Sequence, residues 1–182
     1  MTEEEVKEHS NDREFILKAV AENGKFLDLA SPELQNDKEV VMAALDQAPE
    51  SLEFASSMLK NDKEVIQKGV RGAPWTICYA SDRLRADREV ILESCKTYGQ
   101  ALYFASEELR DDREVVKAAV ENKGIIIKYA SDRLRNDKEL ALIAVKQNKQ
   151  SYHFISEELK QDEEIKGLLE LSLIHISEPT RP

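Results

Sequence analysis

The sequence repeats itself with a period of 25 residues. The two most similar copies begin at Tyr79, with Y-A-S-D-R-L-R-A-D-R-E-V, and at Tyr129, with Y-A-S-D-R-L-R-N-D-K-E-L. More distant copies begin at Leu29, Phe54, Phe104 and Phe154. A fixed period in this range is the signature of a repeat array, in which each unit closes its core against its neighbours. We therefore expect a solenoid of stacked 25-residue units.

Each copy predicts an α-helix that begins at an aspartate, with a glutamate two residues later. The aspartates are Asp12, Asp37, Asp62, Asp87, Asp112, Asp137 and Asp162. An aspartate at the N-cap accepts a bond from a free backbone N–H, and a glutamate in the first turn complements the helix dipole. Val40, Val41, Ala44 and Leu45 mark one apolar helical face. Glycine or proline should then end the helix, at Gly24, Pro49, Pro74, Gly99 and Gly124.

A second, less regular helical piece completes each copy. It carries a serine in one column, at Ser31, Ser56, Ser81, Ser106, Ser131 and Ser156. In the first copy Pro32 follows Ser31, which favours Ser31 as an N-cap and disfavours a continuous α-helix through it. We therefore expect a short helix and a separate turn of α or 3₁₀ type. No alternation of polar and apolar residues persists along the chain, so the expected fold class is all-α.

Two further features bear on how the copies stack. Small residues should let neighbouring helices approach closely, at Ala19, Ala44, Gly69, Ser94, Ala119 and Ala144. Y-A-S-D-R-L alternates with F-A-S-E-E-L or F-I-S-E-E-L, which suggests that two 25-residue units pair into a unit of 50. Stacking in register would place Arg83 opposite Glu108 and Arg133 opposite Glu158, as exposed pairs worth about 0.2–1 kcal/mol each.

The composition favours a soluble protein of a reducing compartment. The net charge of −10 over 182 residues argues against affinity for nucleic acid or for an anionic membrane. No apolar run reaches membrane-spanning length, so we expect a cytoplasmic protein. Cys78 and Cys95 lack the spacing of a zinc site or of a disulfide framework. We predict no cofactor and no bound metal.

Three segments are expected along the chain. Residues 1–11 are polar and acidic and form either a frayed tail or an N-terminal cap, and residues 12–170 form the array. Residues 171–182, L-S-L-I-H-I-S-E-P-T-R-P, depart from the pattern and resemble the translation of a transposase-based sequencing adapter. We therefore treat this segment as non-native and exclude it from the fold, with the native chain continuing beyond Glu170.

The columns that carry the same residue type in every copy give little support for catalysis or ligand binding. The Asp and Glu columns could hold calcium, but they lack the glycine turn and dense oxygen loop of an EF-hand, and helix capping accounts for both. The repeated serines are expected to be caps, since a catalytic serine needs a single base and an oxyanion site. A basic column could bind an anion but lies close to the acidic columns, which favours an ion-paired surface: Lys60, Arg85, Arg110, Arg135 and Lys160.

Two columns change from copy to copy and are the candidates for partner recognition. One contains Asp28, Glu53, Cys78, Tyr103, Lys128 and His153, and the other contains Lys25, Glu50, Trp75, Gln100, Ile125 and Gln150. The middle copies are apolar and aromatic in these columns, and aromatic side chains are typical binding anchors. The alternative for Trp75 is that it only covers the loop after Pro74. The predicted partner-binding residues are Trp75, Cys78, Tyr103, Ile125, Lys128 and His153.

The pattern (Y/F)-A-S-x-x-L-(R/K)-N-D-(K/R)-E-V-V-x-x-A-V-x-x-N-G, found between Asp12 and Glu170, resembles a tandem repeat called domain of unknown function 4116. The resemblance implies helical repeats of about 50 residues in arrays, with no established activity. The layout is also similar to the leucine-rich variant repeat, which alternates α and 3₁₀ helices. We expect a non-enzymatic interaction module or scaffold for an unknown protein or peptide. The alternatives are a recognition or regulatory arm of a larger, truncated enzyme and, more weakly, a structural spacer.

Overall fold

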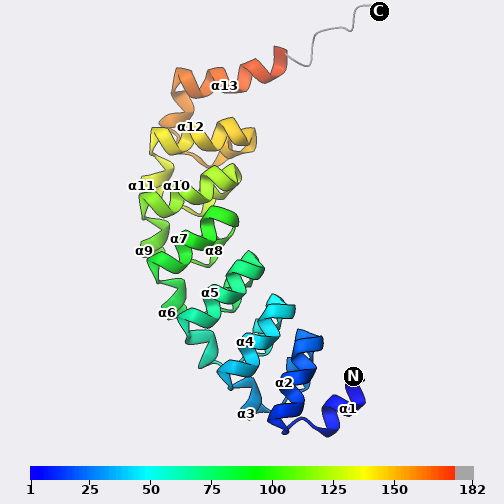
Figure 1. Ribbon diagram of the computed structural model, residues 1–182. Helices are drawn as coiled ribbons and strands as arrows, with labels where there is room; N and C mark the ends of the chain where they lie inside the picture. Colours follow the sequence, from blue (N-terminus) through cyan, green and yellow to red (C-terminus); the bar gives the residue numbers. More distant parts are fainter. Residues whose placement is uncertain (175–182) are drawn as a thin grey trace, which may run out of the picture. The chain divides into compact units, whose positions relative to one another are not determined.

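The computed structural model describes residues 1–174, with side chains described through Leu169. The chain separates into two compact halves, an N-terminal half of residues 1–90 and a C-terminal half that starts at residue 91. Both consist of helices and turns, and the described residues contain no strand (Figure 1). The predicted all-α repeat is confirmed.

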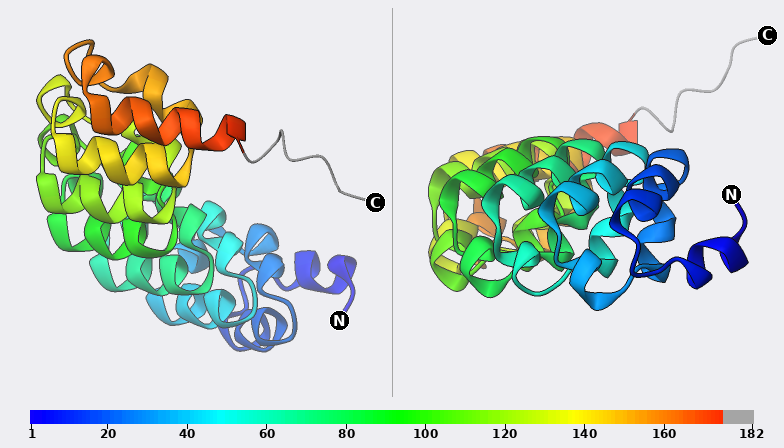
Figure 2. Two further views of the ribbon diagram at one scale, coloured as in Figure 1. Left: turned by 90° about the horizontal axis from the view of Figure 1, so that it is seen from above. Right: turned by 60° about the horizontal axis from the view of Figure 1, so that its bottom comes forward.

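The first layer of each half is built from ten-residue α-helices, one per copy. Each begins directly after its capping aspartate, as predicted: Asp37 accepts from the backbone N–H of Glu39 at 2.9 Å. The helices are α2 (Arg13–Glu22), α4 (Lys38–Gln47), α5 (Lys63–Gly72), α7 (Arg88–Thr97), α10 (Arg113–Asn122) and α12 (Lys138–Gln147), followed by the longer α13 (Glu163–Ile174). In the N-terminal half α4 packs against α2 and α5, and in the C-terminal half α12 packs against α10 and α13 (Figure 2).

The second layer consists of six-residue 3₁₀ segments that follow the α-helices. They are η1 (Gly24–Leu29), η2 (Pro49–Phe54), η4 (Pro74–Tyr79), η5 (Gly124–Tyr129) and η6 (Lys149–Phe154), with a short α-helix, α8 (Ala101–Phe104), in the equivalent place of the remaining copy. A single extended residue reverses the chain between the layers; at Asn23, φ is −149° and ψ is 106°. Neighbouring segments pack against one another, η1 on η2 and η5 on η6.

A short turn at one edge leads from the second layer to the next copy. These turns are α3 (Pro32–Gln35), η3 (Leu59–Asn61), α6 (Asp82–Arg85), α9 (Glu107–Arg110), α11 (Asp132–Arg135) and η7 (Leu159–Gln161). The repeated serine caps them, since Ser131 Oγ accepts from the backbone N–H of Leu134 at 3.2 Å. Its own N–H donates to the preceding copy, from Ser131 to the Arg110 carbonyl at 3.0 Å. The predicted break at the serine is confirmed.

A ladder of ion pairs links successive copies at the start of the first-layer helices. In five copies the base that follows the capping aspartate reaches the aspartate and glutamate of the next copy, and these bases are Arg13, Lys38, Lys63, Arg113 and Lys138. Arg13 thus donates to Asp37 at 2.7 Å, and Arg113 donates to Asp137 at 2.8 Å. The hydrogen bond from Arg13 lowers the pKa of the Asp37 carboxyl, although partial burial opposes it. The carboxylate therefore caps its own helix and fixes the register of the previous one.

The predicted pairing of arginines with glutamates of the same column is wrong for Arg133. Its Nε donates to Asp111 Oδ1 at 3.0 Å and its Nη2 to the Asp111 carbonyl at 2.6 Å, whereas Glu158 accepts from Asn136 at 3.2 Å. Arg83 makes the equivalent contact with Asn61, at 2.8 Å from Nε to Oδ1. The reason is geometrical: each turn stacks on the C-terminal residue of the preceding turn, so the arginine points backward along the array.

The predicted stop residues lie two positions past the first-layer helices, as expected, and their glycines also have a role in packing. No positive φ occurs in the described part of the chain, so glycine is not required there for a left-handed backbone. A Cβ on Gly124 would lie 2.5 Å from the carbonyl oxygen of Ala144, and one on Gly99 would lie 2.6 Å from that of Ala119. Close approach of the next copy's helix therefore excludes a side chain here, because a Cβ contact under 3 Å cannot be accommodated.

The core lies between the two layers. The small column is buried as predicted: Ala19, Ala44, Ser94, Ala119 and Ala144 have no exposed surface. From the second layer Leu27, Leu52, Ile77, Leu102 and Ile127 are equally inaccessible. Cys95 is a fully buried core residue, and this burial raises the pKa of its thiol to about 12. The side chains named here are therefore committed to packing in the core.

The two ends of the array differ from its middle. Residues 1–11 contain α1 (Glu3–Glu8), whose Val6 is fully buried. The carbonyl of Ser10 accepts from the Ser31 N–H at 2.9 Å, and this is the same bond that the serine N–H of later copies donates to the preceding turn. At the other end α13 continues past Glu170, the predicted end of the array. Most of the predicted adapter-derived segment, 171–182, lies outside the described residues, from residue 175 onward.

Candidate functional site

All the predicted partner-binding residues lie in the second layer. Trp75 and Cys78 belong to η4 in the N-terminal half. In the C-terminal half Tyr103 is in α8, Ile125 and Lys128 are in η5, and His153 is in η6. Tyr103 is 52% exposed and Trp75 is 41% exposed, which is unusual for large apolar side chains.

A pocket of about 290 Å³ opens on the second layer of the C-terminal half. Segments α8 and η5, which pack against each other, form its walls. The lining residues are Tyr98, Gln100, Tyr103, Phe104, Lys123, Ile125, Ile126, Lys128 and Tyr129. The structure thus brings three of the predicted residues into one cavity: Tyr103, Ile125 and Lys128.

Ring contacts hold the walls of this pocket in place. The Tyr103 ring meets Phe104 and Tyr129 edge to face, with centroids 5.1 and 5.0 Å apart. The Lys128 ammonium lies 4.8 Å from the ring centroid of Tyr129 and 5.9 Å from that of Phe154. Edge-to-face pairs contribute about 0.5–1.5 kcal/mol beyond the area that they bury, and cation–π contacts add to this. The pocket is therefore preformed.

Gln100 stood in a variable column, but sequence analysis missed five residues of this pocket, namely Tyr98, Phe104, Lys123, Ile126 and Tyr129. Phe104 and Tyr129 belong to the column that opens each repeat motif, which is apolar in every copy and was therefore assigned to the framework. In the structure both are only half-buried and turn part of their rings toward the pocket. Tyr98 carried a usable signal, because its column otherwise holds small, amide or lysine side chains, as at Asn23, Ala48 and Lys123.

The other predicted residues do not line this pocket. His153 is exposed, and its ring centroid lies 6.1 Å from that of its neighbour Tyr152. In the N-terminal half the Trp75 ring lies edge-on to Tyr79 at 6.0 Å. Cys78 is half-buried, and this burial raises the pKa of its thiol, so the sulfur is not activated as a nucleophile.

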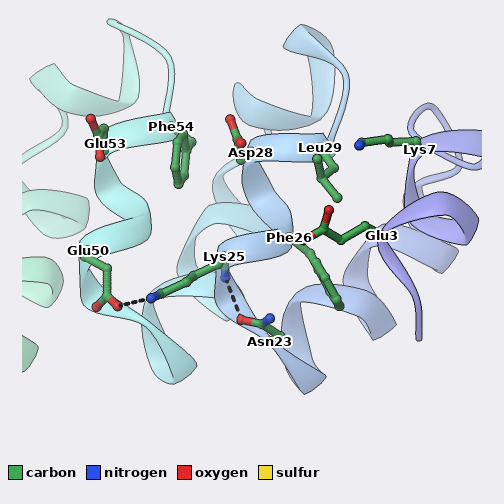
Figure 3. Close-up of a pocket in the computed structure, with 10 residues that line it drawn as sticks. All are labelled: Glu3, Lys7, Asn23, Lys25, Phe26, Asp28, Leu29, Glu50, Glu53 and Phe54. Carbon is green, nitrogen blue, oxygen red and sulfur yellow. Dashed lines mark hydrogen bonds and ion pairs between the residues drawn. The ribbon is translucent and has the colours of Figure 1, made fainter.

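The same columns form a charged pocket of about 520 Å³ in the N-terminal half (Figure 3). Lys25 Nζ pairs with Glu50 Oε1 at 3.4 Å, and the Lys25 backbone N–H donates to Asn23 Oδ1 at 3.1 Å. Asp28 and Glu53 add two more carboxylates to the lining. Phe26 and Phe54 are its aromatic members. At the equivalent positions of the other half, Tyr103 and Ile125 replace Asp28 and Glu50, and Lys128 replaces Glu53 with a charge of opposite sign.

The basic column and the capping carboxylates make local contacts in the structure. In the basic column Lys60 Nζ donates to the Glu53 carbonyl and Arg110 Nη2 to the Tyr103 carbonyl, both at 2.6 Å. Lys160 pairs with Glu157 at 2.6 Å. The capping carboxylates are bonded to backbone N–H groups and to the bases of the ladder. No group of His, Cys, Asp and Glu placed to hold a metal ion occurs among residues 1–174.

Family comparison matches the sequence along most of its length. The matching family is described as Domain of unknown function (DUF4116), and its matches overlap at residues 12–60, 45–85, 62–110, 87–135 and 112–160. The chain belongs to this family. Successive DUF4116 matches begin at residues 62, 87 and 112, which are 25 residues apart. One DUF4116 unit therefore spans two structural copies, and a match can open on either of them.

Membership of the DUF4116 family establishes that the chain consists of tandem repeats, but the family description names no activity. No curated protein and no solved structure matches the chain. In the described part of this DUF4116 array, none of the helices has the length and apolar character needed to cross a membrane.

Proposed function

We propose that this DUF4116 array is a non-enzymatic protein–protein interaction module that binds an extended segment of a partner protein at the pocket around Tyr103. The observation that carries the proposal is the exposed Tyr103 ring between aromatic walls, with lysines at the rim. Exposed aromatic side chains in a preformed hollow are typical anchors of protein interfaces.

Packing does not account for the aromatic ring of Tyr103 in this pocket. Tyr103 shares its column with Asp28 and Glu53, which occupy equivalent places in the same fold and are exposed. An aromatic ring at this position is therefore not required for folding. Repeat proteins separate a constant framework from a variable binding surface, and this column has the properties of the second class.

The chemistry of the pocket favours binding over catalysis. Its lining consists of aromatic and aliphatic residues, two lysines and a glutamine, so it contains no carboxylate or histidine to pair with a lysine in proton transfer. A volume of about 290 Å³ is at the low end for ligand pockets and suits one large apolar side chain better than a cofactor.

Selection from a random peptide library against the full 182-residue chain tests the proposed function. We expect enrichment of peptides that bind the wild-type chain and lose at least about tenfold in affinity on Tyr103→Ala, a loss of about 1.4 kcal/mol. Glu53→Ala removes the side chain of the same column in the N-terminal half and should leave affinity unchanged. Both variants must retain the circular dichroism spectrum of the parent. Failure to enrich any peptide, or equal binding to Tyr103→Ala, would contradict the proposal.

A further inference from the structure

The second layer carries opposite net charge in the two halves. Residues 23–29, 48–54 and 73–79 contain Asp28, Glu50 and Glu53 against Lys25, a net charge of −2. Residues 98–104, 123–129 and 148–154 contain no Asp or Glu and include Lys123, Lys128 and Lys149, a net charge of +3 with His153 neutral. In a chain of net charge −10, a stretch of surface segments without any carboxylate is a local exception.

Cationic groups stand directly at the hydrophobic pocket. Lys123 and Lys128 both line it, and both are exposed. The Lys128 ammonium is held near the rings of Tyr129 and Phe154, so that its position is defined. Arg110 lies outside the lining, and its Nη2 donates to the backbone carbonyl of Tyr103 at 2.6 Å. An acidic group bound at the rim would therefore meet the positive charge of Lys123 and Lys128 on the η5 side.

We propose that this pocket is selective for an acidic protein segment in which one large apolar side chain is flanked by aspartate or glutamate. The inference rests on the proposed function and specifies its partner. The apolar side chain would contact Tyr103 and Ile125, and the flanking carboxylates would lie near Lys123 and Lys128. Complementary charge at a rim contributes mainly to association rate and to selection among partners, while the buried anchor supplies affinity.

Three fluorescein-labelled nonapeptides provide the probe for this selectivity. Each has a central phenylalanine with two test residues on either side, and these are glutamate, glutamine or lysine in the three peptides. Binding to the full chain is measured by fluorescence anisotropy at about 50 and about 300 mM NaCl. We expect the glutamate peptide to bind at least about tenfold more tightly than the glutamine peptide at low salt, with the difference shrinking at high salt. The lysine peptide should bind most weakly.

Charge reversal at the rim separates electrostatic recognition from a general effect of charge. The double variant Lys123→Glu, Lys128→Glu should abolish the preference for the glutamate peptide and favour the lysine peptide. Lys146→Glu makes the same change on α12, in the first layer of the same half, and serves as the control because Lys146 is exposed outside the pocket. Circular dichroism and the thermal midpoint verify that each variant is folded.

The outcomes are distinguishable. A glutamate preference that is lost in the double variant and kept in Lys146→Glu supports the proposal. Equal binding of all three peptides that is still lost on Tyr103→Ala would overturn the acidic selectivity and leave the interaction site in place. No binding of any peptide, together with failure of the library selection, would overturn both. Light scattering that shows concentration-dependent self-association, abolished by Tyr103→Ala, would also overturn the proposed acidic partner, because the occupant of the pocket would then be a second copy of the chain.

Discussion

The copies that begin at Asp12 and Asp37 and those that begin at Asp87 and Asp112 form equivalent second-layer surfaces with different side chains. Asp28 corresponds to Tyr103, Glu50 to Ile125, and Glu53 to Lys128. Beneath these positions the framework is the same, since Leu27, Leu52, Leu102 and Ile127 are all fully buried. The comparison teaches that the fold tolerates different side chains at the exposed second-layer positions. At the buried positions beside them in sequence, the fold requires an apolar side chain.

The strongest test of a shared framework is a matched pair of core truncations. Leu52→Ala and Leu102→Ala remove equivalent, fully buried side chains from the two halves. Each should lower the free energy of unfolding by about 2–5 kcal/mol, through lost burial and a residual cavity. Urea denaturation followed by circular dichroism measures both losses. A cost below about 1 kcal/mol in one half alone would show that the framework is not equivalent.

The glycine column provides the next largest expected effect. Gly124→Ala would place a Cβ 2.5 Å from the Ala144 carbonyl, so we expect a loss of about 1–3 kcal/mol in the free energy of unfolding. Gly167→Ala is the control, because a Cβ there has no neighbour within 4 Å and lies in α13. It should stabilise the chain by about 0.5–1 kcal/mol. If both substitutions change the urea midpoint in the same direction, close approach is not the reason for Gly124.

Transplanting the pocket would sharpen the comparison between the halves. The triple variant Asp28→Tyr, Glu50→Ile, Glu53→Lys gives the N-terminal half the side chains of Tyr103, Ile125 and Lys128. Because these columns are exposed, the fold should be retained, and a second peptide site should appear. Isothermal titration with the glutamate peptide should then show a stoichiometry of about two where the parent shows one, with the new site within about tenfold of the first in affinity. A stable variant that stays at one site would mean that Tyr98 and Phe104 are also required.

The smallest effect concerns the ion-pair ladder, which both halves share. Hydrogen bonds from Arg13 and Lys138 lower the pKa values of Asp37 and Asp162 from the ordinary 3.8. A carboxyl with a lower pKa in the folded state adds stability that is present above its unfolded pKa and is lost as pH falls through the folded one. The urea midpoint should therefore fall between pH 5 and pH 3 by more in the parent than in Arg13→Gln. High salt should reduce the difference, since these pairs are exposed. Equal acid sensitivity would remove the ladder as its source.

Much of the architecture was predictable because it depends on short-range chemistry that every copy repeats. The capping aspartate, the capping Ser131 and the buried column of small residues each depend on neighbours within one or two helical turns. The sequence pattern therefore indicates them directly. The candidate site was predictable only in part. Tyr103, Ile125 and Lys128 were identified by their variability, and Phe104 and Tyr129 were not, because a half-buried ring in a constant column looks the same in sequence as a core residue.

Contacts between copies could not be predicted from the columns alone. The sequence places Arg133 and Glu158 in equivalent positions, but whether a side chain points toward the next copy or the preceding one depends on how the turns stack. The same holds for Gly124, whose local sequence is typical of a helix end and whose actual constraint is a carbonyl of the following helix.

By itself the sequence determined the 25-residue period, the helix starts and the all-α class, because these follow from local capping and from apolar periodicity. The tertiary structure decided which variable residues share a surface. Tyr103 and Tyr129 are 26 residues apart in the chain, and their rings meet at 5.0 Å only because α8 packs on η5. Side-chain direction and the distance between layers are properties of the packed copies, so the pocket and its cationic rim exist only in the folded array.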